Sequence, residues 1–251
     1  MKKALLSAVA LFLIFSAFAQ DTLKTVVPAE VTIVKKKKKE FDLSNRSGDH
    51  LLLQLGYAGW NGTPDTINTG GLPRSFNAYF MFDFPFKNNP RISAAIGVGV
   101  GTDHIFFKKT SVGIKDPTET IQFRNLADTN HFKKYKIATT WLEAPIELRY
   151  SSRPDKPGKS FKAAIGVKVG TLLKAGTKGK NWQNKEGNTL ISYTEKISSK
   201  RFFNTIRVAP TVRVGYGHVS LYGTYTVGSL FKEGLGPDVR AYSIGITLSG
   251  L

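Results

Sequence analysis

Cysteine is absent from the 251-residue sequence, and this absence excludes several kinds of chemistry. Without thiols the chain forms no disulfide, uses no cysteine nucleophile and carries no lipid on a cysteine. Acidic residues are also scarce, because 18 Asp and Glu stand against 36 Lys and Arg, a formal net charge of +18. Such a basic chain attracts anionic partners, although charge alone does not say which ones.

Long apolar runs are missing as well, apart from one near the N-terminus. No stretch after residue 19 has the roughly 18 uninterrupted apolar residues that predict a membrane helix. A helical anchor in this part of the chain is therefore disfavoured. A membrane β-barrel stays possible, because its strands need only about 9–11 residues each and alternate in polarity.

The first residues have the organisation of a secretory signal peptide. Lys2 and Lys3 precede an apolar stretch over residues 4–16, and Ala17-Phe18-Ala19 then offers a small-residue cleavage site. We expect residues 1–19 to direct export through the periplasm. Their removal leaves 34 basic residues (36 minus Lys2 and Lys3) against 18 acidic residues, a net charge of +16.

Residues 20–48 form a basic, polar segment that includes the run from Lys35 to Lys39. Adjacent like charges repel one another and are typical of solvated chain, so we expect a flexible periplasmic segment here. Binding of the lysine run to anionic lipid, peptidoglycan or a partner is the alternative.

Residues 49–251 show the two-residue periodicity of β-strands. It is clearest over residues 76–86, where Phe76, Ala78, Phe80, Phe82, Phe84 and Phe86 occupy every second position and share one face. A protein core and a lipid bilayer would both accept this face. The alternation predicts eight strands, at about 49–60, 76–86, 91–101, 138–150, 160–172, 203–216, 218–227 and 239–249.

The connections between these strands alternate between long and short. The long ones are polar and span residues 61–74, 102–137, 173–202 and 228–238, whereas residues 87–90, residues 151–159 and Gly217 provide turns. Long loops at one end and short turns at the other are typical of outer-membrane barrels, and a secreted β-sandwich offers no reason for them. The sequence therefore predicts an all-β fold, an eight-stranded antiparallel up-and-down transmembrane β-barrel, located in the bacterial cell outer membrane.

The second face of the predicted strands mixes small residues with charges of both signs. An eight-stranded barrel has an interior just wide enough for side chains to fill. Charges enclosed there are costly unless they are paired, so we expect an ion-pair network inside the barrel. Its candidate members are Asp83, Glu143, Glu147, Arg149, Lys162, Lys168, Arg207 and Arg213.

One strand carries a family resemblance. Residues 142–150, with the sequence Leu-Glu-Ala-Pro-Ile-Glu-Leu-Arg-Tyr, are similar to the L-E-x-P-x-x-L-(K/R)-Y strand of PorT-like outer-membrane β-barrel proteins from Bacteroidetes. The glycine-rich stretch 165–170 and residues 242–246 fit the same pattern, so the resemblance covers about residues 49–251. It implies an eight-stranded outer-membrane barrel. It implies little about activity, since most members have no assigned function and one branch belongs to a secretion machinery.

Candidates for catalysis are few. Asp103 and His104 lie at the loop end of a strand and His131 lies in the following loop, a place where barrel enzymes position acid–base groups. Adjacent strand residues face opposite ways, however, so Asp103 and His104 do not form a simple dyad. The four His residues lack the spacing of a metal site, and residues 97–101 lack the spacing of a dinucleotide loop. We predict no catalytic residue, metal or cofactor.

The two longest predicted loops are strongly basic. A solvated surface explains this, and so does contact with the phosphates of lipopolysaccharide or another external polyanion. Candidate contacts are Lys108, Lys109, Lys133, Lys134, Lys178 and Lys180. Nucleic acid is disfavoured by export and by the lack of a nucleic-acid motif.

The sequence thus favours a non-enzymatic outer-membrane barrel with a structural, adhesive or secretion-associated role. Outer-membrane lipid and cell-envelope or secretion proteins are the expected partners. A narrow channel for small solutes is the alternative, and an enzyme at the barrel rim is the remote one.

Overall fold

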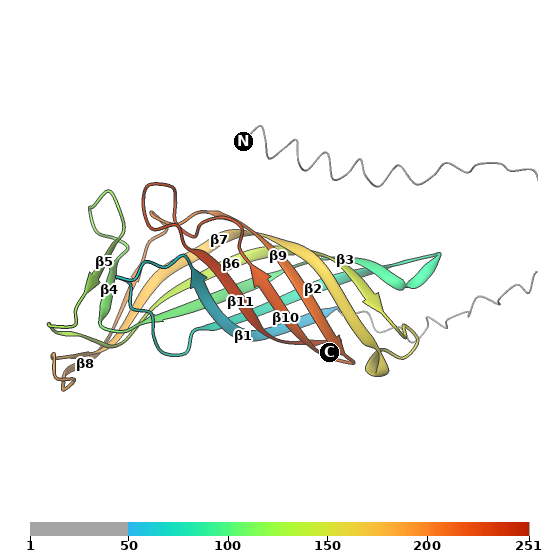
Figure 1. The fold of residues 1–251 in the computed structure, drawn as a ribbon, viewed down its shortest axis with the longest axis horizontal. Coiled ribbons are helices and arrows are strands. Elements are labelled where there is room, and N and C mark those ends of the chain that lie inside the picture. Colours follow the sequence, from blue (N-terminus) through green and yellow to red (C-terminus); the bar gives the residue numbers. More distant parts are fainter. Residues whose placement is uncertain (1–49, 251) are drawn as a thin grey trace, which may run out of the picture. The chain divides into compact units, whose positions relative to one another are not determined.

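A computed structural model of the protein describes residues 50–250. The predicted signal peptide (1–19) and basic segment (20–48) therefore lie outside the described residues. Each long strand pairs antiparallel with the next one along the chain, β1 pairs with β11, and β6 pairs with β7, so eight strands close into a barrel. These strands are β1 (Leu51–Asn61), β2 (Arg74–Phe86), β3 (Asn89–Phe107), β6 (His131–Ser151), β7 (Phe161–Gln183), β9 (Ile206–Tyr216), β10 (Val219–Tyr225) and β11 (Arg240–Ser249) (Figure 1).

The alternation of the sequence becomes an apolar outside and a polar inside. The phenylalanines of β2 point outward, and Phe82 near the middle of the row keeps 48% of its surface exposed. Other strands around the barrel add Ile96, Val98, Leu142, Ile146, Val212 and Ile244 to the same exposed band. A continuous apolar band of this extent is unsuited to water and matches the lipid-facing surface of a membrane barrel.

Three strands are much longer than a membrane requires. β3, β6 and β7 contain 19, 21 and 23 residues, against the roughly 9–11 that cross a bilayer. The expectation that residues 102–137 and 173–202 are loops is therefore wrong over much of their length. Those residues continue the three strands beyond the apolar band, form the hairpin of β4 (Thr110–Gly113) and β5 (Gln122–Asn125), and supply β8 (Thr189–Ser198), which pairs with β7.

These extra elements enclose a hydrophobic core of their own, which we call the cap core. It contains Ile105, Phe107, Val112, Ile114, Ile121, Tyr135, Ile137, Trp141, Phe202, Phe203, Phe231 and Val239, all buried. β4, β5 and β8 lie at one end of the barrel (Figure 1). The core escaped prediction because its residues come from segments far apart in the sequence, such as Ile105, Tyr135, Phe203 and Phe231, and no short window shows that these segments meet.

The opposite end of the barrel is made of short turns. β2 and β3 join at residues 87–88, and a 3-10 helix, η2 (Pro157–Lys159), lies in the connection between β6 and β7. Gly217 joins β9 to β10 with a positive φ of 61°, which a residue without a Cβ adopts readily. The described part of the chain has no helix of the length and apolarity needed to cross a bilayer.

Candidate functional site

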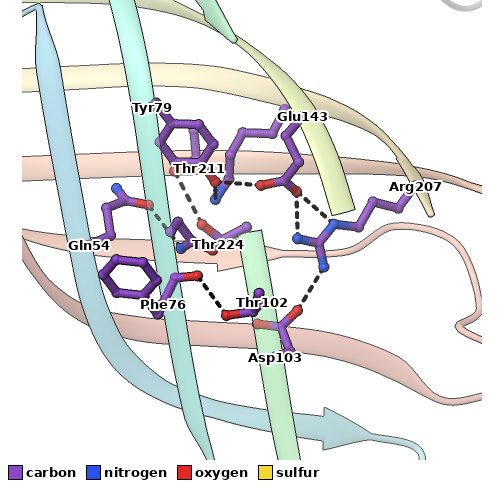
Figure 2. A network of polar contacts seen from close by, with 11 residues as sticks. Gln54, Phe76, Tyr79, Thr102, Asp103, Glu143, Arg207, Thr211 and Thr224 are labelled. Carbon is purple, nitrogen blue, oxygen red and sulfur yellow. Dashed lines mark hydrogen bonds and ion pairs between the residues drawn. The ribbon is translucent and has the colours of Figure 1, made fainter. Parts of the chain in front are cut away.

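A cluster of charged groups fills the cap-side half of the barrel interior. The Arg207 guanidinium donates from Nε to Oε1 of Glu143 at 2.7 Å and from Nη1 to Oδ2 of Asp103 at 2.8 Å. The Tyr79 hydroxyl donates to the other oxygen of Glu143, and Lys168 Nζ donates to the Tyr79 hydroxyl at 3.2 Å. Figure 2 shows Arg207 lying between the two carboxylates, which stand on β6 and β3.

A second cluster occupies the half nearer the short turns. Oε2 of Glu147 accepts from Arg149 Nε at 2.8 Å and from Arg213 Nη2 at 3.0 Å. Arg149 also lies 3.8 Å from Asp83, whose carboxylate accepts from the Ser93 hydroxyl at 2.6 Å. Because each buried carboxylate faces at least one guanidinium, the charges of this cluster compensate one another.

Glycines make room for the larger groups. A Cβ added at Gly101 would lie 2.6 Å from Oε2 of Glu143, and one at Gly170 would lie 3.0 Å from Cγ of the same residue. Small residues on β3 and β7 thus accept the bulk of Glu143 on β6, which lies between those strands. This complementarity explains why the inward face mixes glycine with charge.

The structure brings most of the eight predicted interior residues into contact. Asp83, Glu143, Glu147, Arg149, Arg207 and Arg213 form ion pairs. Lys168 is buried in the cap-side cluster, where its contact is the Tyr79 hydroxyl. Lys162 is half-buried and lines a cavity of about 40 Å³ together with Asp83, Arg149 and Arg213.

Two interior residues were missed or misplaced by sequence reasoning. Asp103 was considered as a rim acid, but β3 continues past it and turns its carboxylate inward to Arg207. Tyr79 stands opposite the phenylalanine row of β2 and is buried. The alternation of β2 was enough to predict that Tyr79 faces inward. The inward position of Asp103 could be predicted only by knowing that β3 extends to Phe107.

The histidines at the rim contact different groups. Nδ1 of His104 lies 3.4 Å from Lys136 Nζ on the outer face, while Asp103 faces inward. His131 lies within 2.9 Å of both the Thr129 carbonyl and the Gln183 amide nitrogen. Residues 50–250 hold no group of three or more potential metal ligands.

The six lysines predicted to contact polyanions divide into two sets. Lys134, Lys178 and Lys180 lie on the outward face of the extended strands, where Lys134 is the direct partner of Lys180. Lys108 and Lys109 are exposed in the turn between β3 and β4, Lys133 is exposed near the start of β6, and Lys109 has a positive φ of 48°. Three further lysines on the outward face, Lys136, Lys174 and Lys196, were not among the candidates because strand pairing alone brings them together.

A cleft lies between β8 and the β4–β5 hairpin. It has a volume of about 370 Å³, and aromatic side chains (Phe132, Tyr135, Trp182 and Tyr193) line it together with Asp116, Arg124 and Glu195. Aromatic rings beside polar groups offer both apolar contact and hydrogen bonds to a ligand.

Comparison with known proteins places the chain among outer-membrane barrels. No curated protein matches it. Among solved structures, that of Ail, the attachment invasion locus protein of Yersinia pestis, in complex with the heparin analogue sucrose octasulfate is similar, at 12% identity and a TM-score of 0.31, over 79% of this chain and 96% of that one. Residues 54–234 match the model of the outer membrane protein beta-barrel domain. The chain therefore belongs to the family of outer-membrane proteins with this β-barrel domain.

Proposed function

We propose that the protein is a non-enzymatic outer-membrane barrel that holds a folded platform at the cell surface and has a structural or adhesive role toward polyanions such as lipopolysaccharide. The observation that carries this proposal is the contrast between a filled interior and an elaborate exterior. Ion pairs occupy both halves of the lumen, and the cap core lies at its cap end.

The packing of the lumen argues against the alternative of a solute channel. The cavities that border the two charge clusters measure about 40 and 10 Å³, room for a few water molecules at most. Opening a path would require parting Arg207 from Glu143, and separating buried charges is costly.

Conductance of the purified protein in a planar lipid bilayer tests this proposal. We expect no stepwise conductance above that of the bare bilayer, at either polarity. Steady single-channel steps from the parent protein would contradict the structural role and favour the channel.

The resemblance to PorT-like proteins supports a secretion-associated version of the same role. In that case the cap or the periplasmic turns would dock an envelope protein. Mild crosslinking in native outer membranes followed by purification tests this version. Recovery of a defined secretion component at constant stoichiometry would support it, and recovery of lipid alone would favour the structural or adhesive role.

A further inference from the structure

The outward face of the extended strands carries lysines in direct register. Lys136 on β6 is the partner of Lys178 on β7, and Lys178 is the partner of Lys196 on β8. Directly opposed side chains share a face and lie close together, and like charges in this arrangement are destabilising. We call this row and its neighbours the lysine ladder, which comprises Lys134, Lys136, Lys174, Lys178, Lys180 and Lys196.

Carboxylates do not neutralise this ladder. Among the ion pairs of residues 50–250, none joins a ladder lysine to an Asp or Glu. Lys136 instead lies beside His104, at 3.4 Å, and over the ring of Phe106, 5.5 Å from its centroid. No ion pair among the described residues therefore offsets the positive charge of the row.

The ionisation of two groups at the ladder reflects this local field. Both lie on strand extensions beyond the apolar band. Burial, followed by the charges of Lys178 and Arg74, lowers the pKa of Lys136. Burial, followed by the charge of Lys136, lowers the pKa of His104. A bound anion would relieve the repulsion that both groups experience.

Four of the six ladder lysines border a hollow of about 320 Å³. Cationic or ionisable side chains line it (His104, Lys136, Lys174, Lys178 and Lys196), and between them stand the small residues Ala138, Thr140, Gly176 and Ser198. Lysines around a floor of small side chains leave space for an oxygen-rich group, and several ammonium donors can share its oxygens.

The position of the hollow indicates where its ligand comes from. Leu173, with 45% of its surface exposed, belongs to the lipid-facing band, and Lys174 follows it directly. Both are exposed because the strand is irregular there: Thr140 pairs with Lys174, while Trp141 pairs with Leu172. The hollow therefore begins at the edge of the band, on the wall that faces neighbouring lipids.

Strand geometry also sets the height of the ladder. Lys136 lies six residues along β6 from the lipid-facing Leu142. At about 3.3 Å per residue this is roughly 20 Å along the strand, or about 14 Å in height at a tilt near 45°. Lys136 thus lies farther from the lipid-facing Leu142 than the depth of a simple phospholipid headgroup layer, which favours a larger headgroup with more than one phosphate.

We propose that the lysine ladder binds the phosphorylated headgroup of an outer-leaflet glycolipid of the lipopolysaccharide class. This inference deepens the proposed contact with polyanions and rests on it. The sideways orientation of the hollow, continuous with the lipid-facing wall, favours a membrane lipid over a soluble polymer. Lys108, Lys109 and Lys133 do not line the hollow and lie outside the proposed site.

A matched pair of triple variants tests the proposal. One variant replaces the central row (Lys136→Gln, Lys178→Gln and Lys196→Gln), and the control replaces three exposed lysines that do not line the hollow (Lys108→Gln, Lys109→Gln and Lys133→Gln). Both lose three positive charges. Each protein is folded in phosphatidylcholine vesicles with and without lipopolysaccharide, extracted in mild detergent and examined by native mass spectrometry for retained glycolipid.

We expect the parent and the control to retain one glycolipid. The ladder variant should retain at least tenfold less glycolipid than the parent. Removal of opposed like charges should leave the ladder variant folded, as checked by its heat-dependent gel shift. Equal loss in both triple variants, or no retention by the parent, would overturn the proposal. Should the ladder variant fail to fold, Lys178→Gln alone serves, with a severalfold loss expected and an unchanged retention contradicting the site.

Soluble competitors identify the source of the phosphate. Inorganic phosphate and heparin are added to the parent before extraction at equal concentrations of charge. We expect lipopolysaccharide to remain bound, because its acyl chains stay in the membrane. Displacement by heparin with equal apparent affinity would assign the ladder to a soluble polyanion and overturn the lipid assignment. The conductance measurement is independent, so a pore would refute the proposed structural role and leave this result standing.

Discussion

Arg207 stabilises two carboxylates at once, and its loss leaves both of them inside the barrel. The Arg207 guanidinium contacts the carboxylates of Glu143 and Asp103 at 2.5–2.8 Å. Arg207→Leu removes this positive charge and leaves both carboxylates inside the barrel without it. Removal of one partner of a buried pair costs about 3–5 kcal/mol. Urea unfolding in lipid vesicles should show this as a large fall in the midpoint.

The control for that experiment is Arg240→Leu. Arg240 pairs with Asp238 at 3.5 Å, and the two side chains are 45% and 69% exposed. An exposed pair contributes about 0–1 kcal/mol. Equal losses in the two variants would show that burial of the Arg207 network does not matter.

Phe82 and Asp83 are adjacent in β2, and one faces lipid while the other faces the lumen. Substitutions at these two positions therefore distinguish a change on the lipid-facing surface from a change inside the barrel. Phe82→Arg places a charge in the lipid-facing band, which costs roughly 2–4 kcal/mol near the bilayer midplane. Asp83→Asn keeps an acceptor for the Ser93 hydroxyl and loses an ion pair that spans 3.8 Å. We expect Phe82→Arg to impair folding far more than Asp83→Asn.

The measurement is the folded fraction in vesicles of two hydrocarbon thicknesses, followed by gel shift. The defect of Phe82→Arg should be present in both. If Phe82→Arg folds as well as the parent in each, the phenylalanine row does not face lipid.

His104 makes the ladder sensitive to acid. Its pKa is lowered in the folded protein, so the unfolded chain binds more protons between that lowered pKa and the ordinary value of about 6.5. Stability from the neutral imidazole is therefore present above about pH 6.5 and is lost as the pH falls through the folded pKa. Arg74, Asp103, Lys136 and Lys178 are the charged groups that act on it.

Histidine NMR spectra in zwitterionic micelles check this prediction, and His104→Gln assigns the signal. We expect an apparent pKa below 6.5 that rises when lipopolysaccharide is added, because phosphate offsets the charge of Lys136. A His104 pKa at or above the ordinary value in the absence of lipopolysaccharide would show that burial and the charge of Lys136 do not act on His104 as we expect.

At the scale of elements, the barrel strands were predictable and their extensions were not. The alternation of Phe76–Phe86 locates β2 because lipid on one side and packed charges on the other act on every residue. The cap residues of β6 instead place Tyr135 and Ile137 inward against scattered loop residues and Lys134 and Lys136 outward. The alternation itself is local, but the partners of the inward residues are distant in sequence, so the sequence alone does not show that they form a core.

The ion-pair network was likewise predictable only in part. Its acidic and basic members follow from strand alternation, since the inward parity is fixed within each strand. Their pairing does not follow, because Glu143 and Arg207 are 64 residues apart and meet only when β6, β7 and β9 lie side by side.

The extension of β7 changes where probes of topology should be placed. Thr177 lies in a predicted loop, yet only 5% of the residue is exposed. Exposed positions of the native cysteine-free chain are better, such as Asn188 before β8 and Asn89 at the turn into β3.

We expect a cysteine at Asn188 to react with an impermeant reagent on intact cells, and a cysteine at Asn89 to react only after the outer membrane is opened. Long elements at the cell surface and short turns in the periplasm are the usual arrangement of such barrels. The reverse pattern of labelling would invert the topology.

The whole molecule combines two cores that are stabilised by different surroundings. The barrel depends on lipid outside and ion pairs inside, whereas the cap depends on burial of apolar side chains away from water. Phe231 is buried in the cap core and contacts Trp60, Phe123 and Phe203 through its ring. Its replacement should therefore damage one core and spare the other.

Phe231→Ala should cost the cap about 3–5 kcal/mol, the usual loss for a buried aromatic residue. The barrel should still form, because its strand ladders and lipid contacts are unchanged, so the heat-dependent gel shift persists. Protease added outside sealed vesicles should cut the variant within residues 108–130 or 184–205 while the parent resists, since local opening of the cap exposes backbone. A variant that loses the gel shift together with the protease resistance would show that cap and barrel fold as one cooperative unit, and the description of two separately stabilised cores would then be wrong.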